Sequence, residues 1–235
     1  MLNHDKLIKS ESGRLSLNSV RPGGPPAQIT QARHLQLIRT IFHPEADAQR
    51  SHRIIALASV HLGGGASSAT ADLGAELACY SGNSTLLVET AALCSAPPLN
   101  ADGIVEHCLE SQVRGFWRYQ PPEASPLMSP PWDQLSYQQM TPCFPEYLQS
   151  CVKTMSQAFV YVLLDCQPLG AASDALMVAP LVDGVVLVIE AGRTTKAQIN
   201  RALRMIEMSR GKVLGFILNK RRYPIPASIY KRIGG

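Results

Sequence analysis

The sequence has few charged and few aromatic side chains. Of its 235 residues, 17% are Asp, Glu, Lys or Arg and 6% are Phe, Trp or Tyr. Ordinary globular proteins carry about 25% charged residues, and a disordered chain needs more net charge and less apolar content than the 46% found here. The formal net charge of +4 is also small. These values exclude a long charged disordered chain, and we expect no nucleic-acid partner.

Features typical of secreted and membrane proteins are missing as well. The six cysteines contain no C-x-x-C pair and none at zinc-ligand spacing from a histidine, so we expect reduced thiols. The apolar runs Ile54–Val60 and Val185–Ile189 are far shorter than the roughly 20 residues of a membrane-spanning helix. The polar start, Met1–Ser10, does not fit a signal peptide. We expect a cytoplasmic protein without a transmembrane segment.

The length fits one large domain with a loosely attached arm. Residues 1–30 are predicted to be a flexible N-terminal arm, because they are polar and contain the Pro- and Gly-rich segment Arg21–Pro26. Residues 31–235 are predicted to be the domain. Residues 94–143, which hold almost half of the 17 prolines, are predicted to be an irregular excursion containing a short helix at Gly103–Gln112.

Short apolar runs alternate with helical patterns along the rest of the chain. Strands are predicted at Arg53–Val60, Thr85–Val88, Val160–Leu164, Gly184–Ile189 and Lys212–Leu218. Helices are predicted at Thr30–Phe42, from the glycine-rich segment to about Tyr80, and at Pro145–Ala158, Ser173–Leu181 and Thr195–Ser209. Strands that are apolar on both faces and alternate with helices favour a parallel sheet covered on both sides. The prediction is a three-layer α/β fold with a mostly parallel central sheet.

A glycine-rich loop follows the first predicted strand. Its residues, Gly63-Gly64-Gly65-Ala66-Ser67-Ser68, lead directly into a predicted helix. Glycines let the backbone approach a phosphate, and the helix N-terminus directs N–H groups and a positive dipole at it. The phosphate-loop pattern G-x-x-x-x-G-K-[ST] would have lysine where Ala66 stands. A plain glycine turn with two serine helix caps explains the same string.

Carboxylates end two of the other predicted strands. Glu89 and Asp165 should lie at the same sheet edge as the glycine-rich loop, where α/β proteins bind ligands. Each carboxylate fits a Mg²⁺ ligand, direct or through water, and each also fits a residue that accepts bonds from loop amides. Asp174 and Asp183 are interpreted as a helix cap and a turn residue. His61 is interpreted as a packed loop histidine, because no acid is near it in sequence.

The C-terminal end is basic and contains two tyrosines. Asn219–Pro224 and Tyr230–Arg232 supply five Lys and Arg side chains. A solvated tail explains such a run, and a tail that contacts a partner or acidic lipid headgroups explains it too. The sequence leaves both interpretations open.

Several motifs together resemble one protein family. They are Ile54–Ser59 with the glycine-rich loop, Leu86–Glu89, Val162–Pro168, Ser173–Val185, Ala191–Lys196 and Val213–Asn219. In this order they resemble the cytoplasmic kinase domain of the bacterial tyrosine kinases of capsule and exopolysaccharide synthesis, which are ParA/MinD-like P-loop proteins. The resemblance covers residues 32–233 and is clearest after residue 145. It implies a P-loop NTPase-like fold.

The resemblance also implies roles for individual residues. ATP phosphates would meet Gly63, Gly64, Gly65, Ala66, Ser67 and Ser68. The metal would be held by Ser67 and Asp165, the latter matching the Walker B aspartate. Glu89 and Asp165 would be the catalytic carboxylates, and Asn219 would meet the adenine. Tyr223 and Tyr230 would be the phosphoacceptors.

The chain departs from the family at the residues that carry chemistry. Ala66 replaces the phosphate-binding lysine, and Glu89-Thr90-Ala91 replaces an Asp-x-Asp motif. Arg193 or Lys196 could supply a substitute charge, although nothing in the sequence places either in the site. The tyrosine-rich tail is reduced to Tyr223 and Tyr230.

The family's oligomerisation motif is also reduced. The pattern E-x-x-R-x-x-R reads Arg33, Gln36 and Arg39 here, so only the last arginine is kept. The sequence therefore leaves open whether the chain forms a homo-oligomer.

These observations predict a degenerate, pseudokinase-like protein of exopolysaccharide or capsule biosynthesis and export. Its expected partners are cytoplasmic segments of a membrane chain-length or export protein, which would recruit it to the inner face of the cell membrane. Binding of ATP and Mg²⁺ is expected to be weak or absent. Two alternatives stay open: an active ATP-dependent tyrosine autokinase or ATPase with a relocated lysine, and a MinD-like positioning factor.

Overall fold

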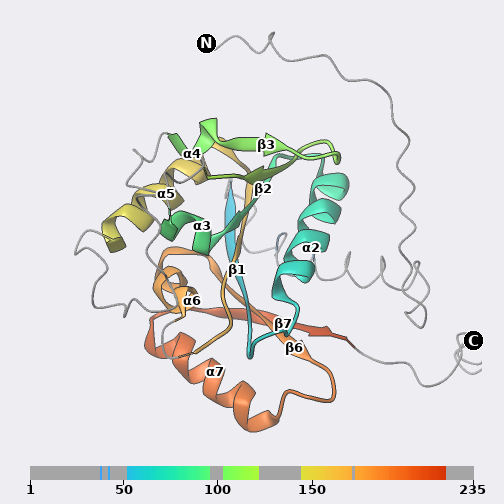
Figure 1. Ribbon diagram of the computed structural model, residues 1–235, viewed down its shortest axis with the longest axis vertical. Helices are drawn as coiled ribbons and strands as arrows, with labels where there is room; N and C mark the ends of the chain where they lie inside the picture. The colour runs from blue at the N-terminus through green and yellow to red at the C-terminus, as the bar shows by residue number, and fades with distance from the viewer. Residues whose placement is uncertain are drawn as a thin grey trace, which may run out of the picture.

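The computed structural model describes residues 38, 42, 52–95, 103–121, 144–170 and 173–220. In this part of the chain, a seven-stranded sheet lies between α2 on one face and α5, α6 and α7 on the other (Figure 1). The strands are β1 (Arg53–Ser59), β2 (Thr85–Glu89), β3 (Cys108–Glu110), β4 (Phe116–Tyr119), β5 (Tyr161–Asp165), β6 (Gly184–Glu190) and β7 (Val213–Asn219). The helices are α2 (Ala66–Ser81), α3 (Thr90–Ser95), α4 (Gly103–Glu106), α5 (Phe144–Ala158), α6 (Asp174–Val178), the 3-10 turn η4 (Ala179–Leu181) and α7 (Lys196–Met208). The predicted three-layer α/β fold is confirmed.

The strand order is β3-β4-β2-β5-β1-β6-β7, and every pair except β3 with β4 is parallel. The five predicted strands are β1, β2, β5, β6 and β7, each within two residues of its predicted ends. Register places Glu89 of β2 beside Asp165 of β5, and Leu57 of β1 on the other side of Asp165. The carboxyl ends of these strands therefore meet at one edge, as the sequence predicted.

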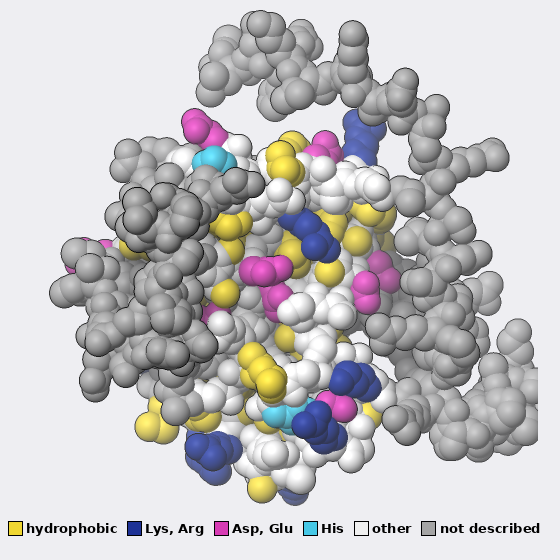
Figure 2. Space-filling model, viewed as in Figure 1, with side chains coloured by type: hydrophobic (Ala, Val, Ile, Leu, Met, Phe, Trp, Pro, Cys, Tyr) yellow, Lys and Arg dark blue, Asp and Glu magenta, His cyan; other side chains and the backbone are white. Residues whose placement is uncertain are grey.

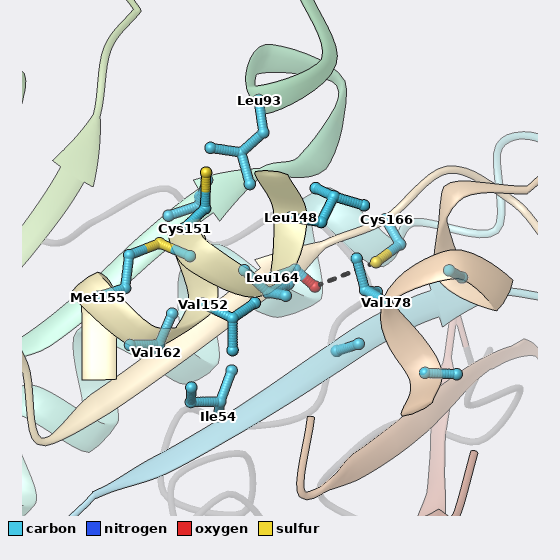
Figure 3. Close-up of a cluster of buried hydrophobic side chains, with 14 of the residues drawn as sticks. Ile54, Leu93, Leu148, Cys151, Val152, Met155, Val162, Leu164, Cys166 and Val178 are labelled. Carbon is cyan, nitrogen blue, oxygen red and sulfur yellow. Dashed lines mark hydrogen bonds between the residues drawn. The ribbon is translucent and has the colours of Figure 1, made fainter. Parts of the chain in front are cut away.

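Two apolar layers hold the helices on the sheet. Side chains alternate along β1, so Ile54 faces one layer and Ile55 the other, and every residue of β1 is buried. Figure 3 shows the layer beneath α5, where Met155 and Val152 lie over Ile54 and Val162. The opposite layer contains α2 together with Ile38 and Phe42, which are the described part of the helix predicted at Thr30–Phe42.

Local signals explain where the helices begin and end. A capping box of Thr195 and Gln198 opens α7, and Gly82, with φ of 68°, ends α2. Ser173 is the N-cap of α6 and accepts a hydrogen bond from the Ala175 amide. The predicted helix Ser173–Leu181 is thus an α-helix that tightens into η4 near Pro180.

The described residues of the Pro-rich middle are more regular than the sequence predicted. The helix expected at Gly103–Gln112 ends at Glu106, and β3 follows it as an antiparallel partner of β4. The strand β4 brings Phe116 and Tyr119 into the core. Pairing of β4 with β2, and of β3 with β4, creates these strands. Segments of three and four residues are too short to show a period. The predicted N-terminal arm lies outside the described residues.

Among the described residues, no helix is both long and apolar enough to cross a bilayer. Cys79, Cys108, Cys151 and Cys166 are free thiols, and the last three are buried. Burial raises the pKa of Cys108 to about 11. These buried thiols behave as small apolar side chains of the core.

Candidate functional site

Glycine is required at three positions of the loop between β1 and α2. Gly63 and Gly65 have φ values of 73° and 85°, in the left-handed region. Gly64 has no room for a side chain, because a Cβ there would lie 2.7 Å from Cβ of Ser59. The Gly64 amide donates to the carbonyl of His61 over 3.1 Å and closes the turn. The loop conformation is therefore specified by its residues.

The helix α2 begins at Ala66 with Gly65 as its N-cap. Ser67 and Ser68 lie inside the first turn, so the interpretation of these serines as helix caps is wrong. Gly65 has no side chain that could cap α2, so no N-cap side chain accepts from the first backbone N–H groups of the helix. Such a helix start is suited to an anion that accepts from backbone N–H groups.

A cleft of about 340 Å³ lies where the loop meets the strand ends. It is lined by Ser59, Leu62, Gly63, Gly65, Ala66, Ser67, Ser68, Glu89, Ala91, Asp165, Cys166, Gln167 and Pro168. The three predicted strand ends thus form one site. Two carboxylates, Glu89 and Asp165, face this cleft, and its described lining includes no lysine or arginine.

Asp165 is the buried carboxylate of the cleft. It is 8% exposed, and its Oδ1 has no hydrogen-bond partner among the described residues. Burial raises the pKa of Asp165, a hydrogen bond from Ser67 opposes the rise, and the charges of Glu89 and Asp174 add to it. A buried carboxylate oxygen without a donor, beside a serine hydroxyl, fits a Mg²⁺ ion that also takes phosphate and water ligands.

No described group of three or more His, Cys, Asp and Glu side chains could hold a metal by itself. Phosphate and water would complete the coordination of a metal held by Asp165 and the Ser67 hydroxyl. Such sites are usual for Mg²⁺, which binds through one or two carboxylates and otherwise through phosphates and water.

Thr90 and Asp174 form hydrogen bonds to the end of β5 that carries Asp165 and to the residues that follow it. The Thr90 hydroxyl donates to the backbone oxygen of Asp165 over 3.0 Å, and it also bonds to the Asp174 carboxylate. Asp174 accepts from the amides of Gln167 and Ala175 over 2.9 and 2.8 Å. Its pKa is raised by burial, against the hydrogen bond from Thr90. Asp174 is structural as predicted, but the cap itself is Ser173.

Asp183 fastens the turn before β6 to the first strand. Its carboxylate accepts from the Ile54 amide over 2.8 Å, and its own amide donates to the Ile54 carbonyl over 2.9 Å. This agrees with the predicted role as a turn residue.

Asn219 contacts the glycine-rich loop from the end of β7. Its Nδ2 donates to the carbonyls of Gly64 and Gly65 over 3.1 and 3.4 Å. A Cβ on Gly65 would overlap this amide nitrogen. Asn219 does not line the cleft, and contact with adenine stays a prediction.

A group of charged side chains lies beside the loop. Figure 2 shows basic, acidic and histidine side chains adjoining one another on this face. The carboxylate of Glu190 is 3.3 Å from Nη1 of Arg193, 3.5 Å from Nζ of Lys220 and 3.9 Å from Nδ1 of His61. Desolvation alone would raise the pKa of Glu190, but the charges of Lys220 and Arg193 hold this pKa below its ordinary value.

Lys220 contacts the glycine-rich loop, although it is not among the site residues predicted from the sequence. Its Nζ donates to the Gly63 carbonyl over 2.5 Å, yet only its place after Asn219 marks it in the sequence. Neither Arg193 nor Lys196, the substitutes considered from sequence, lines the cleft. His61 is packed as predicted, with Nε2 at 3.0 Å from the Thr194 hydroxyl, although an acid lies near it in space.

Other predicted residues fall outside the part of the chain that the structure describes. These are Tyr223, Tyr230, Arg33, Gln36 and Arg39. Their roles as phosphoacceptors and as an oligomerisation motif stay predictions.

Comparison with known sequences finds bacterial tyrosine kinases, although no protein-family model matches the chain. Tyrosine-protein kinase CpsD of Streptococcus agalactiae is 36% identical over 74 residues, which make up 32% of each chain. The succinoglycan biosynthesis transport protein ExoP of Rhizobium meliloti strain 1021 is 37% identical over 73 residues, 31% of this chain and 9% of the relative. The alignments thus span only a minor part of each relative.

Comparison with solved structures covers more of the chain. The chimerical protein CapA2B2 matches with a TM-score of 0.60 at 16% identity, over 87% of this chain and 88% of that one. The kinase domain of the Escherichia coli tyrosine kinase ETK matches with a TM-score of 0.59 at 17% identity, over 91% and 88%. Cobyrinic acid a,c-diamide synthase from Mycobacterium smegmatis, solved with an ATP analogue and magnesium, matches with a TM-score of 0.51 at 18% identity, over 71% and 74%.

At these identities the structural matches establish the fold. They confirm the predicted P-loop NTPase-like architecture, and the sequence relatives confirm the predicted resemblance to bacterial tyrosine-protein kinases. The chain therefore has a P-loop NTPase-like fold and resembles, in sequence and structure, the bacterial tyrosine-protein kinases.

Proposed function

We propose that this chain is a degenerate tyrosine-kinase-like protein of capsule or exopolysaccharide biosynthesis and export. It acts at the cytoplasmic face of the membrane by binding a chain-length or export component. The similarity to CpsD and to ExoP, a biosynthesis transport protein, supports this setting.

One observation carries the proposal of degeneracy. The cleft keeps the glycine loop and the buried Asp165, but its described lining has Ala66 and Ala91 where the related kinases carry a lysine and a carboxylate, and it includes no cation. Phosphoryl transfer depends on positioning and on stabilising the charge of the transferred group. Loss of one well-placed stabilising group costs about 10²–10³ in rate, or roughly 3–4 kcal/mol. We expect nucleotide binding to survive in weak form and catalysis to be lost.

The residues present fit ATP and Mg²⁺ as a bound pair. Gly65, Ala66 and Ser67 would present backbone N–H groups to phosphate oxygens, and the Ser67 hydroxyl with Asp165 would hold the metal. When bound, Mg²⁺ would neutralise phosphate charge. This is needed here, because Glu89 and Asp165 make the cleft negative without it.

The direct test of degeneracy is phosphate transfer from labelled ATP in the presence of Mg²⁺. We expect no ATP-dependent label on Tyr223 or Tyr230 and no phosphate release above that of Asp165→Ala. Label on either tyrosine, abolished by Asp165→Ala, would show an active autokinase and overturn the proposal.

The association is tested separately in cells. The chain should be recovered with membranes when the chain-length component is present and remain in the supernatant when that component is deleted. Equal distribution in both strains would contradict the proposed partner.

The active autokinase remains the second candidate, and it needs a cation in the cleft. Of the described cations, Arg193, Lys196 and Lys220 do not line the cleft. The structure therefore favours the degenerate protein over the active enzyme. The cell division ATPase MinD of Pyrococcus furiosus shares the fold at a TM-score of 0.50, but no contact among the described residues favours a MinD-like positioning factor.

A further inference from the structure

The end of β7 reaches three successive carbonyls of the glycine-rich loop. Lys220 donates to Gly63 over 2.5 Å, and Asn219 donates to Gly64 and Gly65 over 3.1 and 3.4 Å. These residues are more than 150 positions apart in sequence. The loop is therefore held by side chains from a strand on the far side of β6.

Lys220 has a backbone conformation that is uncommon for lysine. Its φ is 54°, in the left-handed region. Its amide donates to Oδ1 of Asn219 over 2.8 Å, and this bond leaves Nδ2 of Asn219 facing the loop. Its ammonium is anchored a second time, 3.5 Å from the Glu190 carboxylate at the end of β6. The side chain thus has two fixed partners although it is 46% exposed.

Holding a carbonyl also sets the direction of an amide. A peptide unit is planar and trans, so its C=O and N–H point in opposite directions. The carbonyls of Gly64 and Gly65 face Asn219, and the amides of Gly65 and Ala66 then point away from β7. Gly65 and Ala66 line the cleft, whereas Asn219 and Lys220 do not. The contacts from β7 therefore lie on the outer side of the loop.

The charged ammonium of Lys220 lies outside the cleft. Its ammonium lies between the Gly63 carbonyl and Glu190, and it does not line the cleft. It therefore does not replace the lysine missing at position 66. Its geometry is that of a group that holds the loop.

We propose that Lys220 is a positioning residue for the glycine-rich loop. Anchored on Glu190, it fixes the Gly63 peptide, whose N–H group closes the turn on the His61 carbonyl. Asn219 holds the next two peptides, so the amides of Gly65 and Ala66 are aimed into the cleft before any ligand binds. The inference about loop order stands on these contacts alone. Its consequence for phosphate binding rests on the proposed function.

The first test measures hydrogen exchange of the peptide that contains residues 61–68 in Lys220→Met, Lys220→Arg and wild type. Lys220→Met should speed exchange about threefold to tenfold, because the lost bond is to a charged but half-exposed donor. Lys220→Arg should restore much of the protection. Lys212→Met is the matched control: Lys212 is exposed at the opposite end of β7, and its replacement should leave residues 61–68 unchanged.

Exchange in Lys220→Met equal to that of wild type, or an equal increase in Lys212→Met, would overturn the proposal. Melting temperatures of the variants, expected to be nearly unchanged, separate a loop effect from general destabilisation.

The second test titrates Mg²⁺-ATP and Mg²⁺-pyrophosphate into the same variants. Weaker binding of both probes to Lys220→Met, with recovery in Lys220→Arg, is the expected result. Equal binding to Lys220→Met and wild type would refute the positioning role. If wild type binds neither probe, the nucleotide part of the proposed function fails, and the exchange result alone decides the role of Lys220.

Discussion

Gly65 illustrates how much a single residue determines in this site. Its φ of 85° disfavours any side chain, and the space where a Cβ would lie is filled by the Asn219 amide. From the sequence, the glycines are explained by the close approach of a phosphate to the backbone. The structure adds a reason that involves no ligand, since the loop must let β7 approach.

Gly65→Ala should be more destabilising than a change at an ordinary left-handed glycine. A non-glycine residue in this region costs about 1–2 kcal/mol, and overlap with Asn219 adds roughly 1–3 kcal/mol. Gly192→Ala is the control, because Gly192 has φ of 75° and no heavy atom within 4 Å of the added Cβ. Urea unfolding of both variants makes the comparison. Equal losses would show that Asn219 yields without cost.

Asp165 should make the free protein less stable at neutral pH than at mildly acidic pH. Burial raises the pKa of Asp165. The hydrogen bond from Ser67 lowers this pKa, and the charges of Glu89 and Asp174 raise it further. The folded state then binds this proton more tightly than the unfolded state. Stability should therefore fall as pH rises from the ordinary carboxyl pKa through the raised one.

Asp165→Asn replaces this buried charge with a neutral amide and should raise the free energy of unfolding at pH 7 by about 1 kcal/mol, because a buried charge costs more than a buried neutral polar group. The gain should shrink towards acid pH. Added Mg²⁺ should stabilise wild type and not the variant. Denaturant unfolding between pH 4 and 8 measures both effects. A variant less stable than wild type at pH 7 would contradict this account of Asp165.

At the residue scale, site residues could be predicted from the sequence where they directly follow or end a predicted strand. The loop glycines, Glu89 and Asp165 each end a strand or follow one, and parallel strands bring such positions together. Lys220 could not be found in this way. Its role depends on a left-handed φ and on Glu190 of a neighbouring strand, and neither leaves a pattern along the chain.

At the scale of elements, apolar runs predicted the five long parallel strands but not β3 and β4. The strand β4 supplies a packing surface for α2. Gly74 of α2 lies against Phe116 of β4, and a Cβ on Gly74 would be 2.6 Å from Cε2 of Phe116 and 3.1 Å from Cδ1 of Leu163. The glycine lets the helix approach the sheet closely.

Gly74→Ala should therefore destabilise the protein by about 1–2 kcal/mol through overpacking, although alanine ordinarily gains about 1 kcal/mol over glycine inside a helix. Phe116→Leu removes the crowding ring atoms. In that background Gly74→Ala should become neutral or stabilising, and thermal unfolding of the four proteins gives the coupling. The same loss in both backgrounds would show that Phe116 is not the cause.

At the scale of the whole molecule, the sheet brings carboxylates to the cleft but no described lysine or arginine. The strand ends bring a glycine loop and two carboxylates to one cleft, and its described lining includes no cation. The fold and this collection of residues followed from the alternation of strands and helices. The absence of a cation could not be read from the sequence, because Arg193, Lys196 and Lys220 are all near the same sheet edge and only their contacts show where they lie.

The central claim is that the missing lysine at position 66 has left the loop a weak nucleotide site. Calorimetric titration of Mg²⁺-ATP into wild type and Ala66→Lys tests it most directly. Ala66 lines the cleft at the start of α2, so a lysine there would supply the charge that the described lining lacks. We predict weak or undetectable binding to wild type and at least about tenfold tighter binding to Ala66→Lys, equivalent to about 1.4 kcal/mol. Tight binding to wild type that Asp165→Ala abolishes and Ala66→Lys does not improve would contradict the account.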